Sequence, residues 1–254
     1  MSLFKAMATV AGITGLSRIA GFIRDILMAS ILGAGPIADA FFVALKLPNF
    51  FRKVTAEGAF SVSFVPLYSE VLEKEGSIRA HLFASRMFSI MLCLLSVFTV
   101  LFMLVMPYII YVIAPGFEAD SERYDMAVYM SWITFPYLLL MSLTALLGGV
   151  LNAHNKFAPF AFTPVLFNLT LIAALFSADL FANAGYALSY GILVAGLIQL
   201  IFIYIAAYRS GIHISLSTPY FSKNAIEVFK RMGPGLVGAG VLQINLFADL
   251  MIAS

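Results

Sequence analysis

The sequence predicts an all-α, polytopic membrane protein, and three observations lead to that prediction. Of the 254 residues, 62% are hydrophobic and only 11% are charged, whereas soluble domains carry about 25% charged residues. The apolar residues form long runs of roughly 20 residues or more, the length of one membrane-spanning helix. The lysines and arginines of the connecting segments fall almost entirely on one side of these runs.

Six apolar segments follow one another, and glycine or proline marks most of their ends. The first ends at the glycine- and proline-rich turn 33–36, Pro48 and Gly58 interrupt the second, and Pro115 follows the third. Pro136 lies inside the fourth segment. The segments are predicted at about 6–32, 37–68, 82–113, 126–151, 157–176 and 186–208.

A polar connection and a seventh apolar segment follow. Ser222 is placed to cap a short helix whose apolar face is formed by Ala225, Ile226, Phe229 and Met232. This pattern indicates either an amphipathic helix on the cytoplasmic membrane surface or a plain helical linker. The seventh segment has no partner helix, which predicts a longer transporter. We therefore expect a six-helix N-terminal lobe (1–208), a cytoplasmic amphipathic connection (209–232) and the first helix of a second lobe (233–254).

The positive charges predict the orientation, because cytoplasmic connections are enriched in lysine and arginine. With a cytoplasmic N-terminus, the outer connections contain only Arg123. The inner connections contain Lys5, Lys74, Arg79, Arg86, Lys156, Arg209, Lys223, Lys230 and Arg231.

Charged residues inside the first two apolar segments are the main functional clue. An ionised side chain at the bilayer centre costs about 2.5–3.5 kcal/mol. Arg18, Arg24 and Asp25 together would cost roughly 8–10 kcal/mol if they faced lipid, so they are expected to face protein or a wet cavity. The complete set of cations and anions is Arg18, Arg24, Lys46, Arg52, Lys53, Asp25, Asp39 and Glu57.

Two interpretations of this set remain open. Arginine pairs with phosphate through a planar fork and keeps its proton, so the surplus of cations predicts a binding site for a mobile anion such as a diphosphate. Alternatively, the charges pair among themselves and only fix helix packing. The pairs would then be Arg18 with Asp25, and Lys46 and Lys53 with Asp39 and Glu57.

Other polar residues are weaker candidates. Asn49 follows the helix break at Pro48, and Asn168 is expected to hydrogen-bond either a ligand or a neighbouring helix. Asp249 is a candidate site for a metal cation or a proton. The three histidines are His81, His154 and His213. They lack the spacing of metal ligands, and we expect them to be solvated in separate connections.

No nucleotide-binding loop or nucleophile motif is visible, so the sequence does not predict an enzyme or a bound cofactor. Energy would come from a coupling ion such as Na⁺ or H⁺, from the membrane potential or from the substrate gradient. Three other functions remain open: an ion-coupled drug antiporter, a structural scaffold, and a membrane-embedded phospho-sugar transferase. The transferase would hold Mg²⁺ with Asp25, Asp39 and Glu57.

Several runs closely resemble the MurJ (MviN) family of lipid II flippases, most densely before Pro66. The most similar runs lie at 17–25, 33–35, 39–44, 46–49, 56–61, 64–66, 114–117, 134–137, 151–152 and 243–246. The resemblance implies a multidrug/oligosaccharidyl-lipid/polysaccharide (MOP) exporter fold, related to MATE transporters, with two lobes around a cationic cavity. It also implies a place in the bacterial inner membrane.

The resemblance further implies that lipid II moves from the cytoplasmic to the periplasmic leaflet by alternating access, for cell-wall synthesis. Partners would be lipid II, membrane lipids and cell-wall synthesis proteins, but no nucleic acid. A drug or polysaccharide-lipid exporter of the same fold is the alternative. Asp249 matches a position that helps to bind sodium in some relatives. The implied cavity residues are Arg18, Arg24, Asp25, Asp39 and Arg52, with Glu57 in support.

Overall fold

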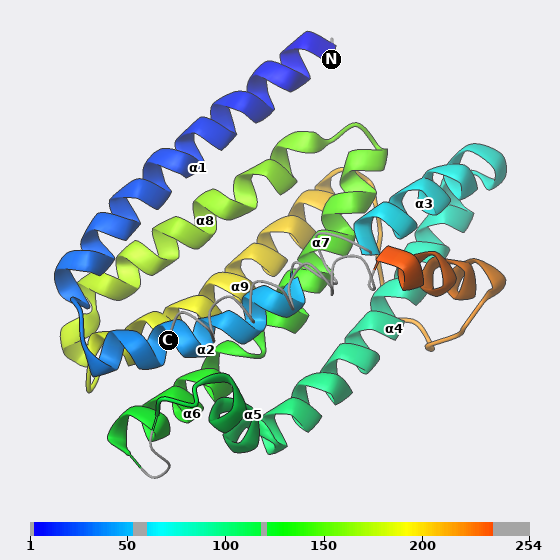
Figure 1. Ribbon diagram of the computed structural model, residues 1–254. Coiled ribbons are helices and arrows are strands. Elements are labelled where there is room, and N and C mark those ends of the chain that lie inside the picture. The colour runs from blue at the N-terminus through cyan, green and yellow to red at the C-terminus, as the bar shows by residue number, and fades with distance from the viewer. Residues whose placement is uncertain (1–2, 53–59, 118–120, 236–254) are drawn as a thin grey trace.

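Helices account for all regular elements in the described parts of the chain. The computed structural model describes residues 3–52, 60–117 and 121–235. A further helix covers 223–235. The other helices (Figure 1) are α1 (Leu3–Ile31), α2 (Pro36–Phe51), α3 (Ser61–Glu75), α4 (Ser77–Leu104), α5 (Met106–Ile113), α6 (Glu122–Thr134), α7 (Tyr137–Ala153), α8 (Phe157–Phe176), the short 3₁₀ turn η2 (Ala178–Leu180) and α9 (Ala184–Arg209).

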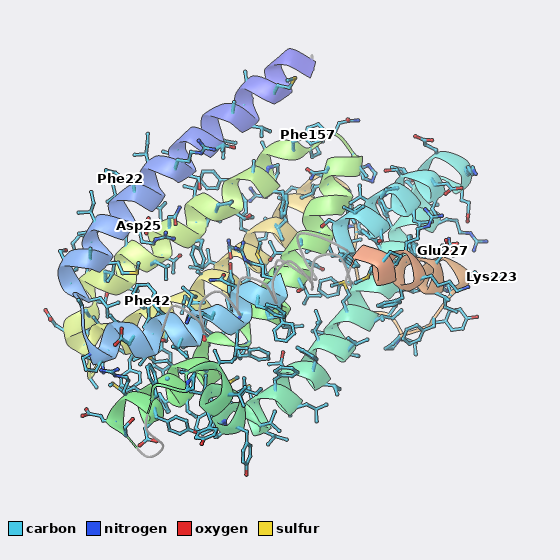
Figure 2. All side chains as sticks on the ribbon, in the orientation of Figure 1. Phe22, Asp25, Phe42, Phe157, Lys223 and Glu227 are labelled. Carbon is cyan, nitrogen blue, oxygen red and sulfur yellow. The ribbon has the colours of Figure 1, made fainter. Side chains whose placement is uncertain are left out.

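Several of these helices have the length and composition of membrane spans. In the described chain, four helical stretches are long and apolar enough: α4, α6 with α7, α8 and α9. α1 is also long, but it carries Arg18, Arg24 and Asp25. Its apolar outer face includes Phe22, which is 67% exposed and points away from the other helices (Figure 2). The prediction of an all-α polytopic membrane protein is therefore confirmed.

The predicted segments differ from the observed helices where a new helix begins at a proline. Segments 6–32, 157–176 and 186–208 correspond closely to α1, α8 and α9. The third segment is divided into α4 and α5, and the fourth into α6 and α7. Pro107 lies in the first turn of α5 and Pro136 directly precedes α7. Proline has no N–H to donate to the preceding turn, so a new helix begins there.

The helices pack around α7. α1 lies along α8 at one edge of the molecule, and α8 packs on α9, which packs on α7 (Figure 1). α2 packs mainly on α6, and α3 and α4 pack on α7. One apolar cluster joins α3, α4 and α7, and a second joins α2, α5, α6, α7, α8 and α9. All residues of α7 from 141 to 151 are buried, because this helix contributes to both clusters.

The connection after α9 contains the predicted short helix, but its buried face differs from the prediction. Ala225, Val228 and Met232 are buried in the same apolar cluster as α3 and α4. Ile226, which was expected on the apolar face, is 43% exposed. Lys223 and Glu227 lie on this helix, as Figure 2 shows. The apolar face therefore packs on the protein rather than lying free on a surface.

Three prolines lie inside described helices without breaking them, namely Pro48, Pro66 and Pro164, so the predicted break at Pro48 is wrong. A threonine hydroxyl compensates for Pro48 and for Pro164. Pro48 in α2 cannot donate to the carbonyl oxygen of Ala44, four residues earlier. Thr134 Oγ1 of α6 donates to that oxygen at 3.2 Å, and it shares this proton with the Ser131 carbonyl at 3.4 Å. The neighbouring helix α6 therefore satisfies the carbonyl group that Pro48 leaves without a donor.

In α8, the threonine hydroxyl that replaces the missing donor comes from the same helix. Pro164 leaves the carbonyl oxygen of Phe160 without a backbone donor. Thr163 Oγ1 donates to this oxygen at 2.8 Å. The helix therefore continues through the proline to Phe176.

Replacement of Thr134 by valine should destabilise the protein, because the buried Ala44 carbonyl would lose its donor. The expected loss is about 1–2 kcal/mol of unfolding free energy. Thermal unfolding in detergent measures it as a lower midpoint. Thr170→Val is the matched control, since Thr170 Oγ1 donates only to the Leu166 carbonyl of its own helix at 2.8 Å. Equal midpoints for the two variants would contradict this role for Thr134.

Candidate functional site

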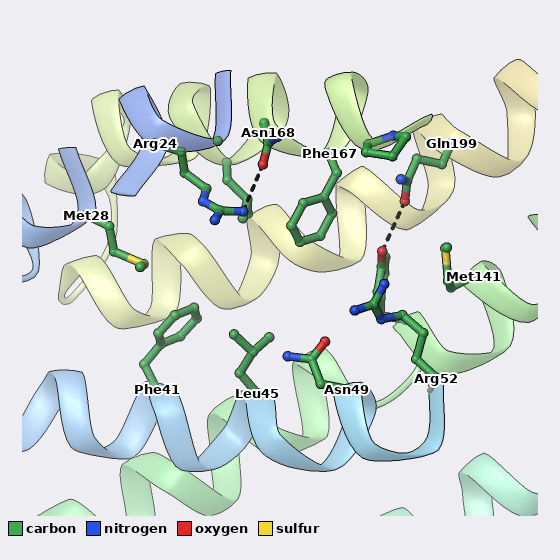
Figure 3. Close-up of a pocket in the computed structure, with 14 residues that line it drawn as sticks. Arg24, Met28, Phe41, Leu45, Asn49, Arg52, Met141, Phe167, Asn168 and Gln199 are labelled. Atoms are coloured by element: carbon green, nitrogen blue, oxygen red, sulfur yellow. Dashed lines mark hydrogen bonds between the residues drawn. The ribbon is translucent and has the colours of Figure 1, made fainter. Parts of the chain in front are cut away.

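A cavity of about 410 Å³ lies between α1, α2, α7, α8 and α9. Figure 3 shows Arg24 entering it from α1 and Arg52 from the C-terminal end of α2. No carboxylate lines the cavity among the described residues. The lining residues are Gly21, Arg24, Met28, Phe41, Leu45, Asn49, Arg52, Tyr137, Met141, Pro164, Phe167, Asn168, Leu171 and Gln199.

Arg24 is held by partners on two helices. Its Nε and Nη2 groups donate to Asp25 Oδ1 at 3.0 and 2.7 Å. Its Nη1 group donates to Asn168 Oδ1 at 2.8 Å. The Arg24 side chain is 23% exposed, whereas that of Asp25 is 56% exposed. A guanidinium has five N–H groups, so two of them remain available to a ligand beside the partners in the described chain.

Asn168 connects α8 to α1 with both ends of its amide. Its oxygen accepts the bond from Arg24, and its Nδ2 donates to the backbone oxygen of Ser17 at 3.0 Å. The two helices come close here because Gly21 has no side chain: a Cβ at this position would lie 3.4 Å from Asn168 Nδ2. Of the two roles left open by the sequence, Asn168 therefore contacts the neighbouring helix and orients Arg24.

A second buried amide, which the sequence pattern did not predict as part of the site, lies at another wall of the cavity. Gln199 on α9 is 2% exposed and donates to the Thr163 carbonyl at 2.8 Å. Tyr137 donates its hydroxyl hydrogen to Gln199 Oε1 at 3.3 Å. Gln199 interrupts a long apolar run in the sequence, and this isolated polar residue was the available signal. The three groups link α7, α8 and α9 beside Arg52 (Figure 3).

The cavity brings together only part of the predicted set. Arg24, Asn49, Arg52 and Asn168 line it. The other members that the structure describes do not line it: Arg18, Asp25, Asp39 and Lys46. Among these, Arg18 is exposed on α1 and Lys46 is half-buried on α2. Lys53, Glu57 and Asp249 lie outside the described residues.

The observed ion pairs differ from those expected under mutual pairing. Asp25 pairs with Arg24 rather than with Arg18. Asp39 pairs with Arg123 of α6, whose Nη1 lies 3.6 Å from Asp39 Oδ2. Arg123, which the sequence assigns to an outer connection, lies far from Asp39 in sequence. Mutual pairing within the first two segments therefore does not account for Asp39.

The lining chemistry suits binding of an anion. Two arginines supply positive charge that does not depend on pH, because guanidinium keeps its proton. Amides of Asn49 and Gln199 add hydrogen-bonding groups, and Phe41 and Phe167 add apolar surface. Over the described ranges, no group of three or more histidine, cysteine, aspartate or glutamate side chains could hold a metal ion.

Comparisons with known proteins agree on one family. Residues 28–254 match the family described as lipid II flippase MurJ. The whole chain is 42% identical to a protein of Rhizobium tropici named probable lipid II flippase MurJ, and it covers 49% of that protein. The chain thus spans about half the length of the curated relatives it matches.

Two solved structures share the fold. One is described as lipid II flippase MurJ in an inward closed conformation, with a TM-score of 0.74 and 28% identity over 94% of this chain and 49% of that one. The other is a MOP superfamily transporter from Pyrococcus furiosus, with a TM-score of 0.71 and 14% identity. The match covers 96% of this chain and 54% of that transporter, and at this identity it supports the fold alone. The chain belongs to the lipid II flippase MurJ family.

Proposed function

We propose that this chain forms part of a flippase that moves lipid II, the peptidoglycan precursor carried on undecaprenyl diphosphate, from the cytoplasmic to the periplasmic leaflet. One observation carries the proposal: Arg24 and Arg52 converge on a cavity whose described lining contains no carboxylate. A diphosphate carries the negative charge that complements these two guanidinium groups. Each arginine fork can pair with two phosphate oxygens.

The remaining parts of the proposal concern the whole transporter. Lipid II has a disaccharide-peptide headgroup, and the 410 Å³ cavity would hold its diphosphate region. The rest of the headgroup would contact a second lobe, in the part that corresponds to the remaining length of the relatives. Alternating access would expose the cavity first to the cytoplasmic and then to the periplasmic side. Cell-wall synthesis proteins that use lipid II are the proposed partners.

Orientation and energy source belong to the same proposal. The distribution of lysine and arginine favours a cytoplasmic N-terminus. Transport would use the membrane potential or a coupling ion such as Na⁺ or H⁺. Asp249 is the proposed cation ligand.

The geometry favours this function over the two chemical alternatives. A transferase that holds Mg²⁺ needs carboxylates close together, but Asp25 pairs with Arg24 and Asp39 pairs with Arg123. An antiporter for cationic drugs needs acidic lining residues, and the described lining instead contains two arginines. The cavity therefore suits an anionic substrate.

Arg24→Ala and Arg52→Ala in the complete protein should each lower lipid II exposure on the periplasmic side by about tenfold or more, because each removes charge-assisted hydrogen bonds. The measurement is complementation of a flippase-depleted strain together with detection of exposed lipid II. Arg79→Ala is the control, since Arg79 is exposed on α4 and outside the cavity. Normal exposure in both cavity variants, at normal protein levels, would overturn the proposed function.

Asn168→Ala should lower transport by an intermediate factor, about three- to tenfold, because Arg24 loses one oriented hydrogen bond. The informative measurement compares this substitution in the native and the Arg24→Ala backgrounds. If Asn168 acts by orienting Arg24, its substitution adds little further loss once Arg24 is absent. An equal additional loss in both backgrounds would show that Asn168 only supports helix packing.

A further inference from the structure

Two of the three histidines are neighbours in space, although they are far apart in sequence. Both lie outside the cavity. His81 is in the second turn of α4, and His154 directly follows α7. Their ring centroids are 5.8 Å apart. The expectation of separate, solvated histidines is therefore wrong for this pair. They lie where α3, α4 and α7 meet.

Tyr68 of α3 is a buried hydrogen-bond partner of His154. Tyr68 is fully buried, and its hydroxyl oxygen lies 3.0 Å from His154 Nε2. The hydroxyl can donate to this nitrogen or accept from it, depending on the tautomer of the ring. Burial lowers the pKa of His154 below its ordinary value.

His81 has no partner that would favour a positive charge. Its Nε2 atom is buried and makes no hydrogen bond within the described residues. The titratable groups that act on His81 there are His154 and His213, the latter in the connection after α9. Glu70 of α3 pairs at the surface with Lys74, at 2.7 Å. The corner thus combines two partly buried imidazoles, and neither pairs with a carboxylate in the described chain.

We propose that His81 and His154 form a proton-binding site that controls the packing of α3 and α4 against α7. Protonation of both rings would place two positive charges 5.8 Å apart in a partly buried corner. It would also leave the buried Nε2–H of His81 without an acceptor in the described chain. Both effects favour separation of the helices, where water can solvate the imidazolium groups.

The direction of the pH effect follows from proton binding. The open corner binds protons more readily than the packed corner, so acidification favours opening. The packed state is stable above the ordinary histidine pKa of about 6.5 and loses stability as the pH falls below it. The corner is connected to the cavity through α7, which also carries Tyr137 and Met141.

Hydrogen–deuterium exchange of the complete protein in lipid nanodiscs tests this site. After correction for intrinsic exchange rates, protection of residues 61–75 and 150–156 should fall about fivefold or more between about pH 7.5 and 5.5. Residues 165–176 of α8 serve as the internal control and should change little. The His81→Gln/His154→Gln double variant should lose the pH response. An unchanged response in this variant, or no response in the native protein, would overturn the proposal.

A second measurement uses the native protein and so avoids any folding defect of the variants. Nuclear magnetic resonance titration should show the His154 ring gaining its proton below the ordinary histidine pKa, because burial disfavours the charged form. Titration of His154 at the ordinary value would contradict the proposed site.

Discussion

An arginine inside an apolar helix has to find hydrogen-bond partners within the protein, and the arrangement around the cavity depends on how Arg24 finds them. Asp25 supplies one partner from the same helix, and Asn168 supplies another from α8. The same asparagine bonds the Ser17 backbone. Solvation of one charge therefore also attaches α1 to α8, which is its main packing partner in the described chain.

Backbone groups released by prolines create a second set of constraints. Pro48 and Pro164 each leave a carbonyl without its helical donor, and Thr134 and Thr163 supply hydroxyl groups in its place. Gln199 then bonds the Thr163 carbonyl and accepts from Tyr137. The polar groups at this wall are thus engaged with one another, which leaves a defined lining beside Arg52.

Local sequence patterns predicted the positions of the helices better than they predicted the contacts between side chains. The segment 157–176 coincides with α8 because it is long, apolar and bounded by polar turns. The division between α4 and α5 was missed because an apolar run hides the effect of Pro107. The partners of Asp25 and Asp39 could not be predicted, because helical spacing identifies a face and not the side chain opposite it. The His81–His154 contact could not be predicted for the same reason, because it joins residues 73 positions apart on different elements.

The two cavity arginines belong to different packing units, and this has a mechanical consequence. Arg24 is attached to α1 and α8, whereas Arg52 ends α2, which packs mainly on α6. Any sliding of one unit against the other would alter the span between the guanidinium groups. A bridging anion would then lose one of its two contacts while both charges persisted. The distance between the two arginines would thus determine how firmly such an anion is held.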